Sequence, residues 1–595
     1  MRQLISKSDL KNALGLKGPL GSCAAGIAYG VCGFRKINKV FDVTADYQGL
    51  DFAEQVLKTL NVTCNVEPNQ FEFIPKEGGF VVVSNHPFGG IEGLILYDIF
   101  AKVRPDFKVM ANFILSKIPN LKDVFFSVNP FTENPEWKSS VGGIKGSINH
   151  LADGNALGIF PAGEVSRYHG HSYPEDLPWS KSVARMIKNA GVPVIPVFWE
   201  GENSRFFYFV DKINSMLGTA RLPKELINKH DKHITLQIGK PILASEIAEY
   251  ENPKELSAYL RSRSYALEAN IKVDKPQFRN ANLKPVDEGR DNAVLKHELE
   301  KIREKSFLFS VSTYDCYFAD YDDIPNLMHE IARQRELAFR AIGEGTGSNI
   351  DTDGFDKHYK HLILWDNAKQ QLAGSYRLGI GSDIMDSLGQ KGFYISTLFK
   401  IDASFEPYLR KTIELGRSFV CVDYQREMLP LMLLFKGLAS VIMKYKDMEH
   451  FIGPVSISSW YPKFYQSMIV EYVSTKHSAE GELTHAVLPM TPFVSDFLKV
   501  DKNVLLNHAM ESVEKFDKFM FRLSNGSYRM PTLFKKYLKL NSKLLCFNVD
   551  PDFNDTLDGL LFLTFKDFPE EEIMPFFKES SEEEKQQVRE RFGYC

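Results

Sequence analysis

Residues 80–93 read FVVVSNHPFGGIEG, and they indicate both a local structure and a chemistry. The five residues up to Ser84 have the unbroken apolar character of a buried strand, and residues 93–103 are typical of the helix that follows it. His86 comes directly after the strand, and the glycines beyond it permit a tight turn. Glu92 is then in a position to orient the imidazole and to stabilise its charged form. The segment predicts His86 as a general base partnered by Glu92, and the alternative is a core histidine that caps the next helix.

The same alternation of strand and helix continues through the N-terminal half. Residues 156–160 and 192–198 are further apolar segments of strand length, and each follows an amphipathic stretch. Short buried strands separated by helices are typical of an α/β sandwich around a mostly parallel sheet. This is the fold class that we predict for the first half of the chain.

Two further sequence blocks accompany these strands. Residues 160–166 read FPAGEVS, and residues 192–197 read VPVIPV. Together with NHPFGG, this ordered set resembles the glycerolipid acyltransferase family, typified by the 1-acylglycerol-3-phosphate acyltransferases, over most of the segment 20–270. The resemblance implies that His86 and Glu92 form the catalytic dyad, that the first block holds the acceptor and that the second completes the site. The substrate-binding residues that it implies are Asn85, Gly89, Gly90, Phe160, Pro161, Gly163, Glu164 and Arg167.

This sequence departs from the family's pattern at two places. Five residues separate His86 from Glu92 here, whereas the family has four residues between the histidine and its acid. Val165 and Ala162 also stand where the family has an arginine and a glutamate. A phosphate monoester is bound best by a bidentate arginine. The lost arginine therefore predicts an acceptor without such a phosphate, unless Arg167 takes its place.

The C-terminal half is also predicted to be α/β, with a more antiparallel sheet. We expect helices at 324–342 and 429–445, and strands at 361–365, 372–378, 411–420 and 450–456. On the third of these strands, Glu414 and Arg417 are three residues apart. Odd spacing places two side chains on opposite faces of a strand unless a bulge intervenes. The alternative interpretation is a buried strand with a charge near each end.

Several motifs of this half occur in a recognisable order. They are Phe339-Arg340, Asp353, Asp356, GSYRL at 374–378, ELGR at 414–417, FIGPVSIS at 451–458 and FNVDPDFNDTLDGLL at 547–561. Over much of 310–565 they resemble the GNAT-related N-acyltransferases, namely the ornithine N-acyltransferases and, more distantly, the acyl-homoserine lactone synthases. The resemblance implies Glu414 as the base or as the group that orients the amine. It implies Arg377 and Arg417 as residues that stabilise the site or bind an acceptor carboxylate.

By the same resemblance the acyl donor is a thioester of acyl carrier protein, with acyl-coenzyme A as the alternative. Residues 423–430, which follow the third strand, contain no glycine, whereas the pyrophosphate loop of a GNAT domain is usually glycine-rich. The GEGTG segment at 343–347 follows a helix and lacks the GK[ST] ending of a phosphate loop, so a nucleotide site is not expected there. We expect neither a cofactor nor a metal.

Length and composition limit the class of protein. The chain has 595 residues, with 72 Lys and Arg against 76 Asp and Glu, and a net charge of -4. This length predicts at least two domains, and the charge argues against a generally basic nucleic-acid binder. Seven cysteines without a CxxC spacing argue against a disulfide framework and a structural zinc site. We expect an O-acyltransferase-like domain over 1–280, a polar linker over 281–305, a GNAT-like domain over 306–565 and an acidic tail over 566–595.

The N-terminal segment indicates a membrane surface. Its first 40 residues contain seven Lys or Arg and one acid, Asp9, among leucines and small apolar residues. Such a segment can lie among the headgroups of an anionic membrane, and the alternative is a pair of ordinary packing helices. No apolar run reaches the roughly 18–20 residues of a spanning helix. The expected location is cytoplasmic, with peripheral association with the inner face of the cytoplasmic membrane.

One domain suited to acylating a hydroxyl and one suited to acylating an amine imply two consecutive acylations. The combination resembles the bifunctional ornithine lipid synthases. By that resemblance the C-terminal domain attaches a 3-hydroxyacyl chain to an amino acid, ornithine by default with glycine as an alternative. The N-terminal domain then esterifies the 3-hydroxyl of this lyso-aminolipid. Two other functions compete with this one: a phospholipid acyltransferase acting on 1-acylglycerol-3-phosphate with an accessory GNAT-like domain, and a non-enzymatic, haemolysin-like protein that binds membranes.

Overall fold

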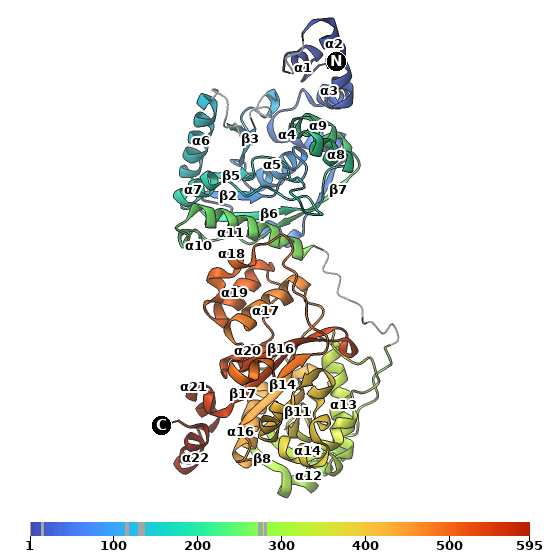
Figure 1. The fold of residues 1–595 in the computed structure, drawn as a ribbon, viewed down its shortest axis with the longest axis vertical. Coiled ribbons are helices and arrows are strands. Elements are labelled where there is room, and N and C mark those ends of the chain that lie inside the picture. The colour runs from blue at the N-terminus through green and yellow to red at the C-terminus, as the bar shows by residue number, and fades with distance from the viewer. Residues whose placement is uncertain are drawn as a thin grey trace. The chain divides into compact units, whose positions relative to one another are not determined.

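The computed structural model describes residues 2–13, 17–112, 118–128, 137–271, 278 and 283–594 (Figure 1). The chain forms two compact units. Unit 1 comprises Met1–Lys272, Phe497–Ala509 and Lys518–Ser527, and unit 2 comprises Val273–Asp496, Met510–Asp517 and Tyr528–Cys595. Two short segments from late in the chain therefore belong to the N-terminal unit.

Unit 1 contains, within its described residues, a seven-stranded sheet in the order β1-β7-β6-β2-β5-β3-β4. Neighbouring strands are parallel except for β6 and β7, so the predicted mostly parallel sheet is confirmed. The strands are β1 Thr63–Asn65, β2 Phe80–Ser84, β3 Lys108–Asn112, β4 Phe125–Val128, β5 Ala156–Ile159, β6 Val194–Trp199 and β7 His233–Ile238. The helices are α1 Lys7–Ala13, α2 Gly18–Val31, α3 Phe34–Thr44, α4 Gly49–Thr59, α5 Ile91–Val103, α6 Trp137–Ala152, α7 Lys181–Ala190, α8 Arg205–Ile213, α9 Ser215–Asn228, α10 Ala244–Ala248, α11 Pro253–Tyr265 and α18 Lys502–Leu506.

Strand β2 lies in the middle of this sheet and is covered on both faces. Phe80 and Val82 belong to one core cluster, with residues of α4 and α5, whereas Val81 and Val83 belong to another, with residues of α7 and α11. All four side chains are fully buried. A strand buried on both faces is apolar at every position rather than at alternate positions, which explains the unbroken run in the sequence.

The strands that precede or contain the three sequence blocks are neighbours. β2 pairs in parallel with β5 on one side and with β6 on the other. Because parallel strands end at the same edge of a sheet, the residues that follow them meet there. Blocks that are far apart in the chain are thereby brought to one place.

Unit 2 contains, in its described part, an eight-stranded sheet in the order β16-β17-β14-β13-β11-β10-β9-β8 and a separate pair, β12 with β15. Within the large sheet only β13 and β14 are parallel neighbours, so the predicted antiparallel character is confirmed. The strands are β8 Phe307–Val311, β9 Tyr314–Asp320, β10 Lys360–Asp366, β11 Gln371–Ile380, β12 Phe399–Ile401, β13 Thr412–Val420, β14 His450–Ile457, β15 Val487–Pro489, β16 Lys543–Asp550 and β17 Thr556–Thr564. The helices are α12 Asn292–Ser306, α13 Pro325–Arg340, α14 Gly381–Ser387, α15 Glu406–Arg410, α16 Leu429–Lys444, α17 Lys463–Lys476, α20 Thr532–Lys539, α21 Glu570–Ile573 and α22 Glu582–Phe592, while α19 Val513–Leu523 has residues in both units.

Strand β13 has two irregularities. It pairs with β14 only over Thr412–Glu414, and beyond these residues the ladder between the two strands ends. Its register with β11 also shifts between Ser375 and Arg377, opposite the point where Arg417 adopts a left-handed φ of 48°. The extra residue is a β-bulge. The simple alternation that would place Glu414 and Arg417 on opposite faces is therefore interrupted between them.

The two ends of the chain are helical. The basic N-terminal segment forms α1, α2 and α3, and the acidic run 582–584 opens α22 behind a Ser581 cap. In the part of the chain that the structure describes, every helix is too short or too polar to cross a membrane.

Candidate active sites

The turn between β2 and α5 brings His86 against Glu92, next to the carboxyl end of β5. His86 follows β2, and Glu92 lies in the first turn of α5. Nδ1 of His86 lies 2.9 Å from Oε1 of Glu92. Phe160, which follows β5, packs its ring on the imidazole with 4.4 Å between the ring centroids. The His86 side chain keeps 19% of its surface exposed, so the predicted pair is in contact and its imidazole is reachable from outside.

Backbone N–H groups hold the Glu92 carboxylate in place. Phe88 and Gly89 donate to Oε1 at 2.8 and 2.7 Å, and Gly90 donates to Oε2 at 2.9 Å. Gly89 has a φ of 89°, and a Cβ there would approach Cδ2 of Leu222 to 2.7 Å. The loop is wound around the carboxylate, which explains how the acid meets the histidine despite the additional residue.

The electrostatics of the pair strengthen His86 as a base. Burial disfavours the charged imidazole, but the charge and hydrogen bond of Glu92 and the charge of Asp176 outweigh burial and raise the pKa of His86. Burial also works against the charge of Glu92, yet His86 and the backbone N–H groups lower its pKa to about 2. Glu92 therefore stays ionised, and the more basic imidazole accepts a proton more readily.

Asp176 supports the same loop, and no sequence pattern points to it. Its Oδ1 accepts hydrogen bonds from N of His86 at 3.2 Å and from Oγ of Ser166 at 2.5 Å. Its Oδ2 accepts a hydrogen bond from Nε1 of Trp179 at 2.9 Å. Ser166 also donates its backbone N–H to O of His86 at 2.8 Å. Asp176 is thus the acid that joins the FPAGEVS block to the histidine loop.

Asn85 precedes the histidine, and its amide is used inside the protein. Nδ2 donates to O of Trp199 at 3.0 Å, and Oδ1 accepts from N of Trp199 at 2.8 Å. These two bonds tie the end of β2 to the end of β6. Asn85, predicted to bind substrate, positions the loop that carries His86.

The FPAGEVS block forms a turn beside the imidazole. Gly163 has a φ of 76° and donates its N–H to O of Phe160 at 3.1 Å. Pro161 is buried, whereas Glu164 is partly exposed. Phe160 is therefore the member of this block whose ring packs on the imidazole, and Gly163 supplies the left-handed backbone of the turn.

The Arg167 guanidinium is already neutralised by the chain itself. Its Nε lies 3.3 Å from Oε2 of Glu164, its Nη1 is paired with Asp211, and its Nη2 donates to Oγ1 of Thr219 at 3.2 Å. The side chain is 8% exposed. Arg167 therefore offers no free cation to a phosphate.

Val165 lies in an apolar cluster. It is buried with Phe207 and Tyr208, and Leu222 packs against the group. The position where the resembled family has an arginine thus faces hydrocarbon and aromatic side chains. An acyl chain suits such surroundings better than a phosphate does.

In unit 2, Glu414 lies at the last residue pair before β13 and β14 diverge. Its Oε2 accepts hydrogen bonds from the hydroxyl of Tyr359 and from N of Tyr394 at 3.2 Å, and its Oε1 accepts one from N of Ile395 at 2.9 Å. Burial raises its pKa to about 7, against the lowering effect of these bonds and of Arg377. Both oxygens already accept hydrogen bonds, so the geometry suits a group that orients the site.

Arg377 and Arg417 belong to one ionic network with the two aspartates of the motif and a third. Nη1 of Arg377 donates to Oδ1 of Asp353 at 2.6 Å and to Oδ1 of Asp356 at 3.1 Å. Nη2 of Arg417 donates to Oδ2 of Asp353 at 3.3 Å, and its Nε lies 3.2 Å from Oδ2 of Asp351. Arg377 is fully buried. The two predicted arginines are thereby fixed by carboxylates of the chain.

Tyr394 connects this network to Glu414, and the sequence patterns did not point to it. Its hydroxyl accepts a hydrogen bond from Nη1 of Arg417 at 3.3 Å, and the guanidinium lies 4.8 Å from the centre of its ring. Its backbone N–H donates to Glu414. The bulge in β13 lets Glu414 and Arg417 both contact Tyr394. Arg377 is joined to Arg417 through Asp353, so the three predicted residues form one site.

The GEGTG segment binds a carboxylate of the chain. Glu336 accepts hydrogen bonds from N of Thr346 at 3.3 Å, from Oγ1 of Thr346 at 2.9 Å and from N of Gly347 at 2.9 Å. The N–H groups that could have held a phosphate are therefore occupied.

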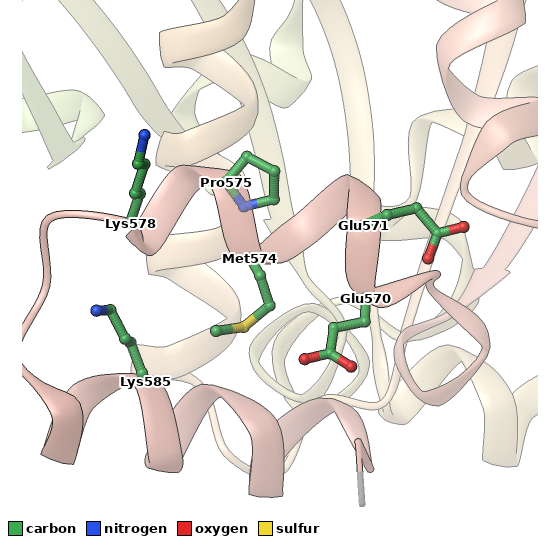
Figure 2. A pocket seen from close by; sticks show the side chains of 6 residues that line it. All are labelled: Glu570, Glu571, Met574, Pro575, Lys578 and Lys585. Atoms are coloured by element: carbon green, nitrogen blue, oxygen red, sulfur yellow. The ribbon is translucent and has the colours of Figure 1, made fainter.

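An open hollow of about 620 Å³ lies in the C-terminal tail (Figure 2). Its walls are formed by Glu570, Glu571, Met574, Pro575, Lys578 and Lys585. Glu570 pairs with Arg589 at 3.1 Å, and Lys585 pairs with Glu582 at 2.8 Å. These walls contain no residue of either candidate site and no histidine. Among the described residues, no group of His, Cys, Asp or Glu side chains is arranged to hold a metal ion.

The chain is similar to known proteins in both units. Residues 32–274 match the family described as acyltransferase, and residues 334–435 match the acetyltransferase (GNAT) domain. A glycine N(alpha)-acyltransferase of Bacteroides thetaiotaomicron is 30% identical over 287 residues, which cover 46% of this chain and 82% of that protein. A lyso-glycine lipid O-acyltransferase of Phocaeicola vulgatus is 29% identical over 227 residues, which cover 37% of this chain and 78% of that protein. Among solved structures, a 1-acyl-sn-glycerophosphate acyltransferase of Thermotoga maritima has a TM-score of 0.25 at 19% identity, covering 40% of this chain and 86% of that one.

Proposed function

The chain belongs to the acyltransferase family that includes the glycine N(alpha)-acyltransferases of Bacteroides thetaiotaomicron and Phocaeicola vulgatus, and from this premise we propose that it makes an aminolipid by two successive acylations. It is an acyltransferase with an N-terminal acyltransferase domain and a C-terminal GNAT domain. Proteins named for the N-acylation of glycine and for the O-acylation of lyso-glycine lipid are both similar to it. The order of the steps follows from chemistry, because the hydroxyl that is esterified lies on the chain attached first.

In the first step, unit 2 transfers a 3-hydroxyacyl group from a thioester to the amino group of an amino acid. Glu414 holds Tyr359 and the backbone of Tyr394 and Ile395 where β13 and β14 cease to pair. Strands that no longer pair with each other leave backbone groups to which an extended ligand can hydrogen-bond as an added strand would. Glu414 acts here as a positioning residue, and the arginine network stabilises the wall beside it.

In the second step, His86 removes the proton from the 3-hydroxyl group. With its Nδ1–H donating to Glu92, the imidazole keeps the lone pair of Nε2 for this role. The hydroxyl oxygen attacks the thioester carbonyl, the new C–O bond forms, the C–S bond breaks, and His86 returns the proton to the departing thiolate. Glu92 remains ionised and stabilises the intermediate imidazolium.

The surroundings of Val165 are the observation that carries the choice of acceptor. Val165 lies in an apolar cluster, and Arg167 is paired with Glu164 and Asp211. A lyso-aminolipid brings a hydroxyl and an acyl chain but no phosphate monoester, so it needs no free arginine at this site. This supports an aminolipid acceptor over 1-acylglycerol-3-phosphate.

Glycine is the amino acid that the names of the relatives favour, and ornithine is the second candidate from the order of the C-terminal motifs. The donor that we propose for both steps is a thioester of acyl carrier protein. The absence of glycine from residues 423–430 supports it over coenzyme A, whose pyrophosphate is usually held by a glycine-rich loop.

Unit 1 also has a surface suited to a membrane. Phe206, Phe209 and Ile213 lie three and four residues apart on α8, so they share one face of the helix, and each is more than half exposed. Ile27 and Val31 of α2 are similarly exposed. We propose peripheral association with the inner face of the cytoplasmic membrane through these side chains, which would keep the single-chain intermediate near the enzyme.

Lipid extraction from a bacterial host that expresses the full chain tests this function. The wild type is expected to produce a new two-chain aminolipid, whose mass identifies glycine or ornithine as the head group. His86→Ala should accumulate the lyso form, because only the second step is lost, and Glu414→Ala should produce neither lipid. His169→Ala, which changes an exposed histidine of unit 1, is the matched control and should behave as the wild type. No new lipid from the wild type would overturn the proposal, and new phosphatidic acid alone would support the phospholipid acyltransferase instead.

A further inference from the structure

Unit 2 contains three buried carboxylates to which the two proposed acylation steps assign no role. Glu344, Asp550 and Asp558 are 2%, 4% and 7% exposed. Glu344 follows α13, while Asp550 ends β16 and Asp558 lies on β17. Carboxylates are rarely buried unless something pairs with their charge.

The strand register places these acids on one face of the sheet. Asp558 is directly opposite Ser456 of β14 on one side and Asn548 of β16 on the other. Side chains at opposed positions point to the same face, and Asp550 is two residues beyond Asn548, so it shares that face too. Oγ of Ser456 donates to Oε2 of Glu344 at 2.8 Å, which brings the third acid to the same place.

The same face carries the proposed N-acylation site. Glu414 is opposite Ile452 of β14, four residues before Ser456 on the same side of that strand. Asp558 therefore lies on the strand next to β14, four residues along from the point where β13 and β14 diverge. Burial and the charges of Asp550 and Asp558 raise the pKa of Tyr394, whereas Arg417 lowers it, so both acids act on the tyrosine that contacts Glu414 and Arg417.

The loop between β16 and β17 lies beside these three carboxylates, Glu344, Asp550 and Asp558, which we call the acidic pocket. Nδ2 of Asn554 donates to O of Gly343, beside Glu344, at 2.8 Å. Phe553 packs against Phe339 of α13, with 5.4 Å between ring centroids, and its ring lies 4.9 Å from the Arg417 guanidinium. The end of α13, this loop and Arg417 are thus the neighbours of the acidic pocket.

The charges of the acidic pocket are not balanced by the chain. Arg417 is the cation whose charge acts on both Asp550 and Asp558, but it is already engaged by Asp351 and Asp353. Burial raises the pKa of Glu344 to about 7. Burial, followed by repulsion from Asp550 and Glu344, raises the pKa of Asp558 well above its usual range. Burial is thus the main cause of both shifts, and for Asp558 the neighbouring acids add to it.

The three acids of the pocket differ in their hydrogen-bond partners, and Asp558 is the best placed of them to bind a ligand. Glu344 is bonded by Ser456, and Asp550 accepts the N–H of Asp552 at 3.0 Å. Within the part of the chain that the structure describes, the Asp558 carboxylate accepts no hydrogen bond and forms no ion pair, although it is nine-tenths buried. A carboxylate that has no partner from the chain and keeps a small exposed area can accept hydrogen bonds from a bound donor.

We propose that this acidic pocket binds the α-ammonium group of the amino acid acceptor, with Asp558 as its direct partner and the group that takes its first proton. The proposal rests on the proposed N-acyltransferase function. An ammonium group carries three donors and one positive charge, which match the acidic surroundings and the unpartnered carboxylate.

The proton transfer completes the chemistry of the first step. The positive charge of the bound ammonium favours the ionised form of Asp558. The carboxylate then takes one proton from the ammonium and leaves a neutral amine with a free lone pair. The amine nitrogen attacks the thioester carbonyl, the C–N bond forms, and the C–S bond breaks. The second proton of the nitrogen leaves with the thiolate as a thiol. Glu414 is not available for this role, because its oxygens already accept bonds from Tyr359, Tyr394 and Ile395.

Steady-state kinetics of the full chain test this assignment. N-acylation is measured with a 3-hydroxyacyl thioester of acyl carrier protein at varied glycine, for the wild type and for Asp558→Asn. The variant should raise KM for glycine at least about tenfold, as expected when a charge-assisted bond is lost, lower kcat, and leave KM for the thioester unchanged. Asp552→Asn makes the same exchange at an exposed position of the same loop and should leave all three constants unchanged. Urea unfolding checks that Asp558→Asn is folded; if it is not, Glu344→Gln is measured instead and should also raise KM for glycine.

The outcomes separate this inference from the proposed function. If the wild type acylates no amino acid, the proposed function itself fails. If the wild type is active and the folded variants keep its KM for glycine, the assignment of the pocket is overturned. A rise in KM for ornithine without a rise for glycine would also overturn it, because the pocket would then hold a side-chain amine.

Discussion

The imidazole of His86 and the carboxylate of Glu92 are 2.9 Å apart, although five residues lie between them in the chain. Three backbone N–H groups turn toward the carboxylate and hold it under the ring. A carboxylate that accepts several backbone hydrogen bonds stays ionised. The geometry therefore makes Glu92 both the anchor of the loop and the charge that raises the basicity of His86.

The pH dependence of O-acylation follows from this pair. The base must be neutral to accept a proton, and the pKa of His86 is raised above its ordinary value of 6.5, so the rate should fall as the pH drops through a midpoint above 6.5. Glu92→Gln removes the charge that raises this pKa and should move the midpoint to lower pH, with a loss in kcat of about 100-fold or more. The measurement is the pH profile of kcat/KM for a lyso-aminolipid. Glu77→Gln, an exposed exchange ahead of β2, should leave the profile in place, and an unmoved midpoint in Glu92→Gln would refute the pairing.

At the scale of an element, the turn between β2 and α5 depends on the backbone of one glycine. Gly89 has a φ of 89°, and a Cβ at this position would meet Leu222 at 2.7 Å. The adjacent Gly90 has an extended φ of -176°, and the nearest atom to its Cβ position is 3.4 Å away. The two glycines therefore have different requirements, although the sequence shows them as a pair.

Gly89→Ala should destabilise unit 1 by about 1–3 kcal/mol, through left-handed strain and the contact with Leu222. It should also reduce O-acylation, because the N–H groups that hold Glu92 shift with the turn. Gly90→Ala is the matched control and should change the free energy of unfolding much less. Urea unfolding and O-acylation rates measure the two effects, and equal behaviour of the two variants would contradict the role given to Gly89.

Strand β13 shows why spacing alone did not settle the C-terminal site. Glu414 and Arg417 have the odd spacing that separates side chains on a regular strand. The bulge at Arg417 interrupts that alternation, and both residues reach Tyr394. The bulge depends on the register with β11, a strand that lies far from Arg417 in sequence. The spacing of Glu414 and Arg417 alone could therefore allow for a bulge but could not predict one.

At the scale of the whole molecule, the proposed function places two acylations on one chain and links them through one amphiphilic intermediate. The exposed apolar side chains of α8 support the proposed association of unit 1 with a membrane. Phe209→Ser combined with Ile213→Ser should weaken binding to anionic phospholipid vesicles at least about tenfold, because two large apolar side chains no longer insert. Leu488→Ser combined with Val494→Ser changes equally exposed positions of unit 2 and should have no effect. Vesicle co-sedimentation measures both, and unchanged binding of the α8 variant would exclude this face.

Patterns within short segments were enough to predict the α/β class, the strands of both sheets that precede or carry the motifs, and the pairing of His86 with Glu92. These features depend on burial of consecutive residues and on turn chemistry, which act over a few positions. Asp176, Tyr394 and the acidic pocket could not be predicted in this way. Each owes its position to strand order and cross-strand register, which bring together side chains that are distant along the chain, and burial among them alters their charge and hydrogen bonding.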